Sequence, residues 1–305
     1  KVNVKVEKLK IPTYKIHKYE KNPMFFENRN VQGASGDIFP MAFNDRLEAG
    51  FEEVAYNHIS LENQYIKVGL LPEIGGRIYS DLDKTNNYNF VYKNNVIKPA
   101  LIGLWGPWLM GGVEFNWPQH HRPTTFLPVD YFIEENEDGS KTVWMGEVEP
   151  LNRTKGMVGI TVFPGKSYIE AKIRLFNRTA YPQSFMWWSN LAVHVNDTYK
   201  AVFPKDIYWA SDHAWALTSS FPIIKGIYKT KDFKDGVDVR VFQNMPVPTS
   251  FFTYDSKYDF LSGYDFVKDG GVVHVSNRHI GTGKKMFTWG VSDFSKAWFD
   301  NLTDE

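Results

Sequence analysis

The fold is read most directly from one stretch, Gly111-Gly112-Val113-Glu114-Phe115-Asn116-Trp117-Pro118-Gln119-His120-His121-Arg122. If this stretch forms a strand, its carboxylate and its amide point to one face, and its apolar side chains point to the other. One face can then pack on a core while the other presents acid and amide to a cleft. The proline ends the strand and brings two histidines and an arginine to its end. The pattern predicts a β-scaffold that holds a polar site for a neutral, hydroxyl-rich ligand.

Alternation of apolar and polar residues, typical of half-buried strands, recurs along most of the chain. The clearest runs lie at residues 1–7, 168–175, 237–241 and 273–275. Sequences that favour hairpin turns follow or precede such runs, at residues 137–140, 164–166 and 269–271. Helical spacing is scarce and predicts one short helix over residues 292–301, with Ser292 or Asp293 as its N-cap. We therefore predict an all-β fold, a large antiparallel sandwich.

The organisation of the chain gives no sign of a linker, a low-complexity segment or an internal repeat. A length of 305 residues fits either one large all-β domain or two ordinary domains. Residues 1–45 contain Asn-Pro, Glu-Asn-Arg-Asn and Gly-Ala-Ser-Gly, and we expect them to form an N-terminal extension or edge strands. Residues 46–305 are predicted to form a single sandwich domain.

The composition excludes several classes of function. Basic and acidic residues number 35 each, so the net charge is zero, and no run of Lys or Arg indicates binding to nucleic acid or to an anionic membrane. No apolar run is long enough to insert into a membrane. The chain has no cysteine, which excludes disulfides, thiol catalysis and thiolate metal sites. Many exported bacterial proteins also avoid cysteine, and we favour the periplasm or the cell surface slightly over the cytoplasm.

Three segments within residues 60–195 resemble the aldose-1-epimerase, or galactose mutarotase-like, family, in that family's order. Residues 61–78 resemble its opening strand pair, with Gly75-Gly76-Arg77 as the turn, and residues 111–122 resemble a strand that leads through Trp-Pro to a sugar-contacting histidine. Residues 175–195 resemble its central strand. The resemblance is strongest to an uncharacterised bacterial domain family found N-terminal to tetratricopeptide repeats. It implies a β-supersandwich, a carbohydrate ligand and further domains of the same polypeptide.

Two departures from that family concern its catalytic groups. The family's central strand places a histidine before an aromatic pair, where this chain reads Trp187-Trp188-Ser189-Asn190. Alternation along this strand puts Trp188, Asn190 and His194 on one face, so His194 could stand in for that histidine. The family also uses a late glutamate as general base. Glu305 is the candidate here, and we expect the domain to continue beyond it.

Acid–base chemistry on a sugar needs two groups that exchange protons near neutral pH. The catalytic candidates are Glu114, His120, His121 and His194. Neighbouring side chains on an extended backbone diverge, so only one of the two adjacent histidines should face the cleft. Side chains that could bind hydroxyl groups or stack on a sugar ring are predicted to contact the substrate: Arg77, Trp108, Asn116, Trp117, Arg122, Trp188 and Asn190.

Each candidate also has a purely structural interpretation. Glu114 could be an ion-pair partner of Arg77 or Arg122. Most tryptophans could pack the core, and one of Trp105, Trp108 and Trp117 would then remain as a surface on which a sugar stacks.

Further catalytic candidates lie elsewhere in the sequence. A second carboxylate could be Glu73, Asp130 or Glu147, and His213 is a further loop candidate.

Two functions therefore stay open. The first is a carbohydrate-active enzyme, either epimerase-like or glycoside-cleaving. The second is a non-catalytic carbohydrate-binding or interaction domain of a larger protein. No metal site is predicted, because no further histidine stands at ligand spacing from His120 and His121. No cofactor is predicted either, because the sequence contains no phosphate-binding or dinucleotide-binding fingerprint.

Overall fold

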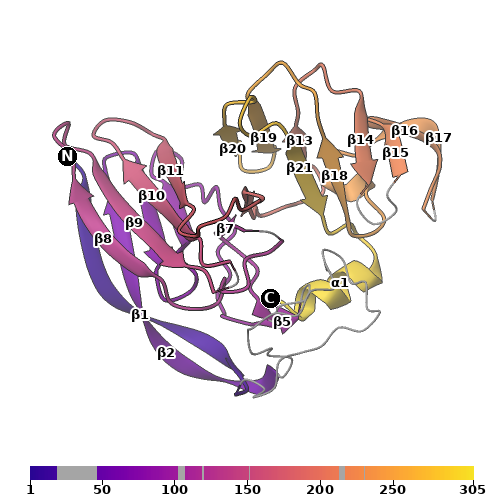
Figure 1. Ribbon diagram of the computed structural model, residues 1–305. Coiled ribbons are helices and arrows are strands. Elements are labelled where there is room, and N and C mark those ends of the chain that lie inside the picture. The colour runs from indigo at the N-terminus through magenta and orange to yellow at the C-terminus, as the bar shows by residue number, and fades with distance from the viewer. Residues whose placement is uncertain (19–46, 102–106, 119, 151, 213–216, 230) are drawn as a thin grey trace. The chain divides into compact units, whose positions relative to one another are not determined.

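The computed structural model describes residues 1–18, 47–101, 107–118, 120–150, 152–212, 217–229 and 231–305. The regular structure of these residues is mainly β-strand, together with one 3-10 turn (Phe242–Asn244) and the α-helix α1 (Asp293–Asp300) (Figure 1). The strand ladders between them are antiparallel. The prediction of an all-β, antiparallel fold is confirmed. None of the described helices is long and apolar enough to cross a membrane.

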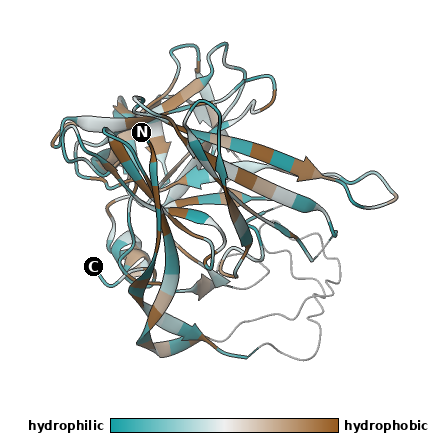
Figure 2. Cartoon of the chain, turned by 90° about the vertical axis from the view of Figure 1, so that its left-hand side faces the viewer, coloured by the Kyte–Doolittle hydropathy of each residue, from teal (hydrophilic) through white to brown (hydrophobic). Residues whose placement is uncertain are grey.

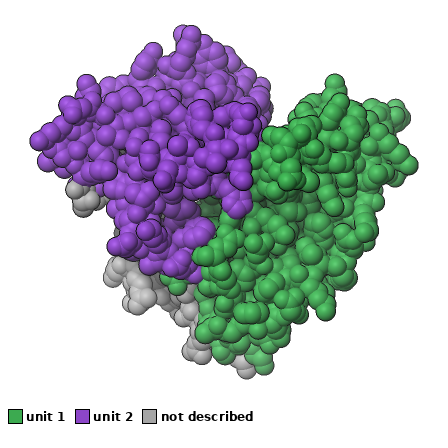
Figure 3. Space-filling view, turned by 180° about the vertical axis from the view of Figure 1, so that it is seen from behind, with its two compact units in different colours: residues 1–193, 301–305 green, residues 194–300 purple. Residues whose placement is uncertain are grey.

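The chain divides into two compact units, shown in green and purple in Figure 3. Unit 1 comprises residues 1–193 and 301–305, and unit 2 comprises residues 194–300. Unit 2 is therefore an insertion within the sequence of unit 1. The boundary predicted at residue 45 stays a prediction, because residues 19–46 lie outside the described part of the chain.

Unit 1 is built on two antiparallel sheets. The larger has the order β1-β2-β3-β4-β7-β12, with strands β1 (Asn3–Ile16), β2 (Leu47–Glu62), β3 (Ile66–Leu71), β4 (Arg77–Asp83), β7 (Val113–Asn116) and β12 (Trp188–Leu191). The smaller has the order β11-β10-β9-β8, with strands β8 (Asp130–Glu135), β9 (Lys141–Val148), β10 (Lys155–Val162) and β11 (Ile169–Phe176). The two-residue strands β5 (Ala100–Leu101) and β6 (Pro107–Trp108) pair with each other.

The core of unit 1 forms where one face of each sheet packs against the other, as expected of a sandwich. Buried apolar side chains come from the larger sheet and from β9 and β10 of the smaller one, among them Leu61, Val68, Val143 and Ile160. Figure 2 shows the alternation along the strands that makes this possible. Val113, Phe115 and Trp117 lie in this core, as the alternation of residues 111–122 predicts.

Local sequence determines two hairpin turns and one helix start, where few residue types fit the backbone. Gly139 and Gly165, in the β8–β9 and β10–β11 hairpins, have φ angles of 78° and 69°, which glycine adopts without steric cost. The helix predicted at residues 292–301 is α1. The Ser295 amide donates to Ser292 Oγ at 3.2 Å, so Ser292 is the N-cap, one of the two residues predicted for it.

Unit 2 contains three small sheets, with orders β13-β19-β20, β15-β14-β18-β21 and β16-β17. Its strands are β13 (Lys200–Val202), β14 (Trp209–Asp212), β15 (Leu217–Ser220), β16 (Ile223–Tyr228), β17 (Lys231–Asp238), β18 (Thr249–Thr253), β19 (Phe260–Asp265), β20 (Gly270–Val275) and β21 (Lys284–Thr288). Its separate core gathers buried aromatic and aliphatic side chains, including Phe203, Phe221, Phe233 and Phe251.

The last residues of the chain pack on unit 1 through several polar contacts. Asn94 donates to the Leu302 carbonyl at 2.9 Å, and Lys98 forms an ion pair with Asp304 at 2.7 Å. The Tyr14 hydroxyl also donates to Asp304, at 2.9 Å. These contacts hold residues 302–304, which follow unit 2 in the sequence, on the rest of unit 1.

The position of the strand that carries Glu114 depends on how Trp117 packs. Its indole is 2% exposed and stacks on Trp187, with ring centroids 5.8 Å apart. The Arg122 guanidinium lies over the same indole, 4.5 Å from its centroid. On β10, Gly156 leaves room for the ring, because a methyl group there would overlap the indole of Trp117.

We expect Gly156→Ala to lower the free energy of unfolding by about 1–3 kcal/mol, because the added methyl overpacks this part of the core. Urea denaturation followed by circular dichroism measures the change. The matched control is Gly50→Ala on β2, where an added methyl meets no atom within 4 Å. Equal losses in the two variants would contradict the packing described for Trp117.

Candidate functional site

Pairing between β7 and β12 brings polar side chains together on the face of β7 opposite the core. Glu114 lies opposite Asn190, and Asn116 lies opposite Trp188. Directly opposed residues of an antiparallel pair point to the same side of a sheet. Because Val113 and Phe115 take the core side, these four residues share the other face.

The Glu114 carboxylate is buried, at 4% exposure, and hydrogen-bond donors surround it. Trp108 Nε1 donates to its Oε2 at 2.9 Å, and Asn190 Nδ2 donates to its Oε1 at 3.3 Å. His121 Nδ1 lies 3.1 Å from Oε1 and 3.3 Å from Oε2. The predicted alternative, an ion pair with Arg77 or Arg122, does not occur among the described residues, where the ionic partner of Glu114 is His121.

The environment of Glu114 keeps it ionised. Burial alone raises the pKa of this carboxyl, but the charge and hydrogen bond of His121, the charge of Arg77 and the Trp108 hydrogen bond outweigh it. Together they lower its pKa to about 2. At neutral pH the group is a fixed negative charge and an acceptor, so it does not act as a proton donor.

His121 is the titratable group of this site that reaches solvent, with 20% of its side chain exposed. Its ring meets Trp188 edge-to-face at 4.7 Å between centroids, and meets Trp108 in the same way at 5.5 Å. Because a carboxylate only accepts hydrogen bonds, it selects the tautomer with the proton on Nδ1. In the neutral ring Nε2 then carries the lone pair and is the nitrogen that can exchange a proton.

His120 contacts the site through its backbone carbonyl as well as its ring. Its backbone φ is 56°, and its carbonyl oxygen accepts a hydrogen bond from Trp188 Nε1 at 3.0 Å. Its ring contacts the ring of His121, with centroids 5.4 Å apart. His121 thus pairs with Glu114, whereas His120 orients Trp188 through its backbone carbonyl. A catalytic role for the His120 ring stays a prediction.

The two predicted sugar-binding arginines are both 3% exposed. Arg77 donates to the carbonyls of Leu109 and Gly111, at 3.0 and 3.1 Å, and to Thr125 Oγ1 at 3.2 Å. Its bond to Gly111 holds the start of β7, so Arg77 anchors the strand that carries Glu114.

Arg122 joins the site to the smaller sheet. Its guanidinium donates to the Gly75 carbonyl and lies 3.5 Å from Glu147 on β9. Its backbone amide donates to Asn116 Oδ1 at 2.7 Å. Burial raises the pKa of Glu147, although Arg122 and a hydrogen bond from Thr124 counteract that effect. Glu147 is thus the one proposed second carboxylate that belongs to this network.

The remaining predicted residues fall into three groups. Trp117 and Asn116 are 2% and 0% exposed, so they have no surface for a ligand in this structure. Trp188 and Asn190 are half-buried beside His121 and Glu114. His194 is the first residue of unit 2, and its role stays a prediction.

Other candidates lie apart from this network or outside the described residues. Glu73 accepts a hydrogen bond from the Asn57 amide, and Asp130 is exposed on β8. Glu305 accepts a hydrogen bond from Asn95 at 3.1 Å. Trp105 and His213 lie outside the described residues. Within the described part of the chain, no three His, Asp or Glu side chains gather as a metal ion would need.

Sequence reasoning missed two threonines of this region. Thr124 and Thr125 are buried, and they hold Glu147 and Arg77 respectively. Their partners lie 23 and 48 residues away in the chain. A pair of threonines before an aromatic residue has no local pattern that would reveal such contacts.

The depressed pKa of Glu114 predicts how stability depends on pH. Between its ordinary pKa of 4.5 and its native pKa of about 2, the unfolded chain binds more protons than the native one. The stabilisation by ionised Glu114 is therefore full above pH 4.5 and is lost as the pH falls towards 2. We expect Glu114→Gln to lower the free energy of unfolding, and we expect the difference from the wild type to shrink as the pH falls from 4.5 to 2. Urea denaturation at several pH values measures it.

The control for this pH series is Glu53→Gln, at an exposed position on β2. We expect that variant to follow the wild type across the whole interval. A deficit of Glu114→Gln that stays constant from pH 7 to pH 2 would contradict the depressed pKa.

Comparison with known proteins places the chain in a family. A family model described as a domain of unknown function (DUF5107) matches residues 35–305. A solved structure of a TPR-domain containing protein from Parabacteroides distasonis ATCC 8503 is similar, with a TM-score of 0.81 at 20% identity over 100% of this chain. The match covers 49% of that protein, so this chain spans about half its length, and at such identity the likeness shows the fold alone. The chain belongs to the DUF5107 family, an uncharacterised domain family.

Proposed function

We propose that unit 1 binds the end of a neutral carbohydrate beside Glu114 and that His121 transfers a proton on the bound sugar. The observation that supports this best is the pairing of a buried, ionised carboxylate with a partly exposed histidine between two indoles. Such a carboxylate fixes the tautomer and orientation of the ring, and it stabilises the imidazolium that forms when Nε2 takes up a proton.

In this proposal Glu114 is a positioning residue and His121 is the catalytic one. Neutral His121 accepts the proton of the anomeric hydroxyl at Nε2 while the bond between C1 and the ring oxygen breaks and a second group protonates the ring oxygen, which gives the open-chain aldehyde. After rotation about the C1–C2 bond the ring oxygen attacks C1 again and returns its proton to the second group, and the imidazolium returns its proton to the oxygen on C1, which gives the other anomer. Proton transfer by a positioned side chain contributes about 10²–10⁴-fold to a rate. The second proton-transfer group that mutarotation needs stays open, with His194 and Glu147 as candidates.

The surroundings of His121 are chemically suited to a sugar. Trp188 is half-buried and held by the His120 carbonyl, so part of its indole is available to the apolar face of a pyranose. Asn190 is half-buried too, and its amide can bind hydroxyl groups. The resemblance of residues 60–195 to galactose mutarotase-like proteins supports the same ligand class. The TPR-domain neighbour supports a place for this domain within a longer polypeptide.

Glycoside cleavage by a pair of carboxyl groups has less support. That reaction needs a protonated carboxyl and an ionised one flanking the bond, about 5–9.5 Å apart. Glu114 is ionised and saturated with donors, and Glu147 is engaged by Arg122 and Thr124.

The alternative that remains is a non-catalytic carbohydrate-binding domain. It is favoured by the complete set of hydrogen bonds around Glu114, which stabilises the site without a reaction.

The test combines sugar binding with product formation in the whole chain. Titration calorimetry on a panel of neutral mono- and oligosaccharides identifies a ligand, and exchange NMR then follows interconversion of its anomers. We expect His121→Gln to lower the rate at least about 10²-fold while the affinity changes by less than about threefold. Glu114→Gln should lower kcat and alter its pH profile, because the ring loses its fixed partner.

The matched control is His279→Gln, at an exposed position in unit 2, which should leave rate and affinity unchanged. If sugars bind and neither His121→Gln nor Glu114→Gln changes any rate, the domain is a binding module and the catalytic proposal is wrong. If no sugar binds, or if Trp188→Ala binds as well as the wild type, the assignment of this site to carbohydrate is wrong.

A further inference from the structure

Unit 2 contains a sheet face that the site in unit 1 does not explain. In the sheet β15-β14-β18-β21, one face packs on the core of unit 2 through Ala210 and Phe251. Alternation then turns the neighbouring residues outward. Trp209 on β14 is 58% exposed, and Phe252 on β18 is 36% exposed. Large aromatic side chains are thus exposed on a face where polar residues are the norm.

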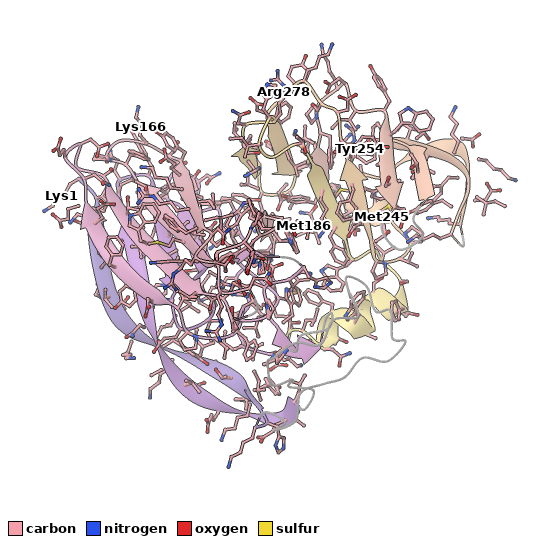
Figure 4. The ribbon with its side chains drawn as sticks, viewed as in Figure 1. Lys1, Lys166, Met186, Met245, Tyr254 and Arg278 are labelled. Atoms are coloured by element: carbon pink, nitrogen blue, oxygen red, sulfur yellow. The ribbon has the colours of Figure 1, made fainter. Side chains whose placement is uncertain are left out.

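Strand register gathers these rings. Ser211 lies opposite Phe252 where β14 pairs with β18, and Trp209 stands two residues before Ser211, on the same face of β14. Tyr254, labelled in Figure 4, directly follows β18, and it is 53% exposed. On the next strand, Phe287 is 37% exposed, and its ring meets Trp289 and Trp298 edge-to-face, with centroids 4.8 and 6.5 Å apart. Across the β18–β21 pair Phe252 faces Lys285 and Phe287 faces Ser250, so rings alternate with polar side chains on this face.

The charge and polarity of this face restrict its partner. Among the described residues that point outward from these four strands, Lys285 is the only charged one, and its Nζ lies 5.9 Å from the centroid of the Phe252 ring. The other outward side chains are aromatic or carry hydroxyls, as Ser211 does. A nucleic acid would need several basic groups to neutralise its phosphates, and an acidic peptide would need more than one cation.

A protein partner fits less well than a glycan. Protein interfaces combine aromatic residues with aliphatic ones, methionine and arginine. The described outward positions of this sheet hold no aliphatic side chain. Aromatic rings separated by hydroxyls match the alternating apolar faces and hydroxyl edges of a sugar chain. A face with almost no charge complements a chain without charge.

We propose that the outward face of the sheet β15-β14-β18-β21 binds an extended neutral polysaccharide through Trp209, Phe252, Tyr254 and Phe287. The rings stack on the apolar faces of successive sugar units, and Ser211 and its neighbours meet the hydroxyls. This surface is separate from the Glu114 site and does not depend on the function proposed for that site. It gives the domain a means of holding a polymer.

The test uses the whole chain in native affinity gels that contain hydroxyethylcellulose, xyloglucan or galactomannan, and in pull-down with insoluble cellulose. At least one polymer should retard the wild type. We expect Trp209→Ala and Phe252→Ala each to weaken retention by about tenfold or more, as loss of an aromatic anchor does. Tyr254→Ala, at an exposed strand end, should weaken it too and is the variant least able to disturb folding.

The matched control is Phe266→Ala, an aromatic residue 59% exposed just beyond β19, in another sheet of unit 2. It should leave retention unchanged, and thermal unfolding checks that all variants are folded. The proposal is overturned if no polymer retards the wild type or if the folded Trp209→Ala and Tyr254→Ala variants bind like the wild type. It is also overturned if these variants lose concentration-dependent self-association instead, because the face would then be an interface between copies of the chain.

Discussion

The structure around the candidate site depends on one constraint, the burial of the charged Glu114 side chain. An ionised carboxylate removed from water costs several kcal/mol unless donors replace its hydration. Here Trp108, Asn190 and His121 supply those donors, from β6, from β12 and from the segment after β7. Each donor binds the same carboxylate, so Glu114 holds together the three segments that carry the donors. Removal of the charge would leave buried donors without an acceptor, which is also unfavourable.

The arginines extend this constraint to the rest of unit 1. Arg77 holds the Gly111 carbonyl at the start of β7, and its charge helps to keep Glu114 ionised. Arg122 covers the indole of Trp117 and reaches Glu147 on the opposite sheet. The two buried cations thus tie the segments around Glu114 to the rest of unit 1, while 20% of the His121 side chain stays exposed. The group that can exchange protons is therefore the one that the framework does not enclose.

The sequence predicted those features that depend on local periodicity. Alternation within residues 111–122 sufficed to assign Val113 and Phe115 to the core and Glu114 to the other face. The helix at residues 292–301 followed from its N-cap and spacing. Contacts between distant segments were not accessible in this way. Nothing near Arg77 indicates that it binds a carbonyl 34 residues away, and nothing near Trp117 indicates that Gly156 on another strand leaves room for its indole. The polar contacts of Leu302 and Asp304 with Asn94, Lys98 and Tyr14 have no local signal either.

Both units use the same pleated geometry, but they differ in what the outward face carries. In unit 1 that face of β7 carries the buried Glu114 carboxylate, which pairs with the partly exposed His121. In unit 2 the described outward face of β14, β18 and β21 carries rings and hydroxyls, and Lys285 is its one charged side chain. A surface of that kind gains affinity by contact with several units of a polymer, and each ring adds a modest amount. Proton transfer needs a single fixed geometry, whereas stacking tolerates movement along a chain. The tasks proposed for the two faces therefore differ on the same class of ligand: the face in unit 1 would act at a chain end, and the face in unit 2 would retain the chain.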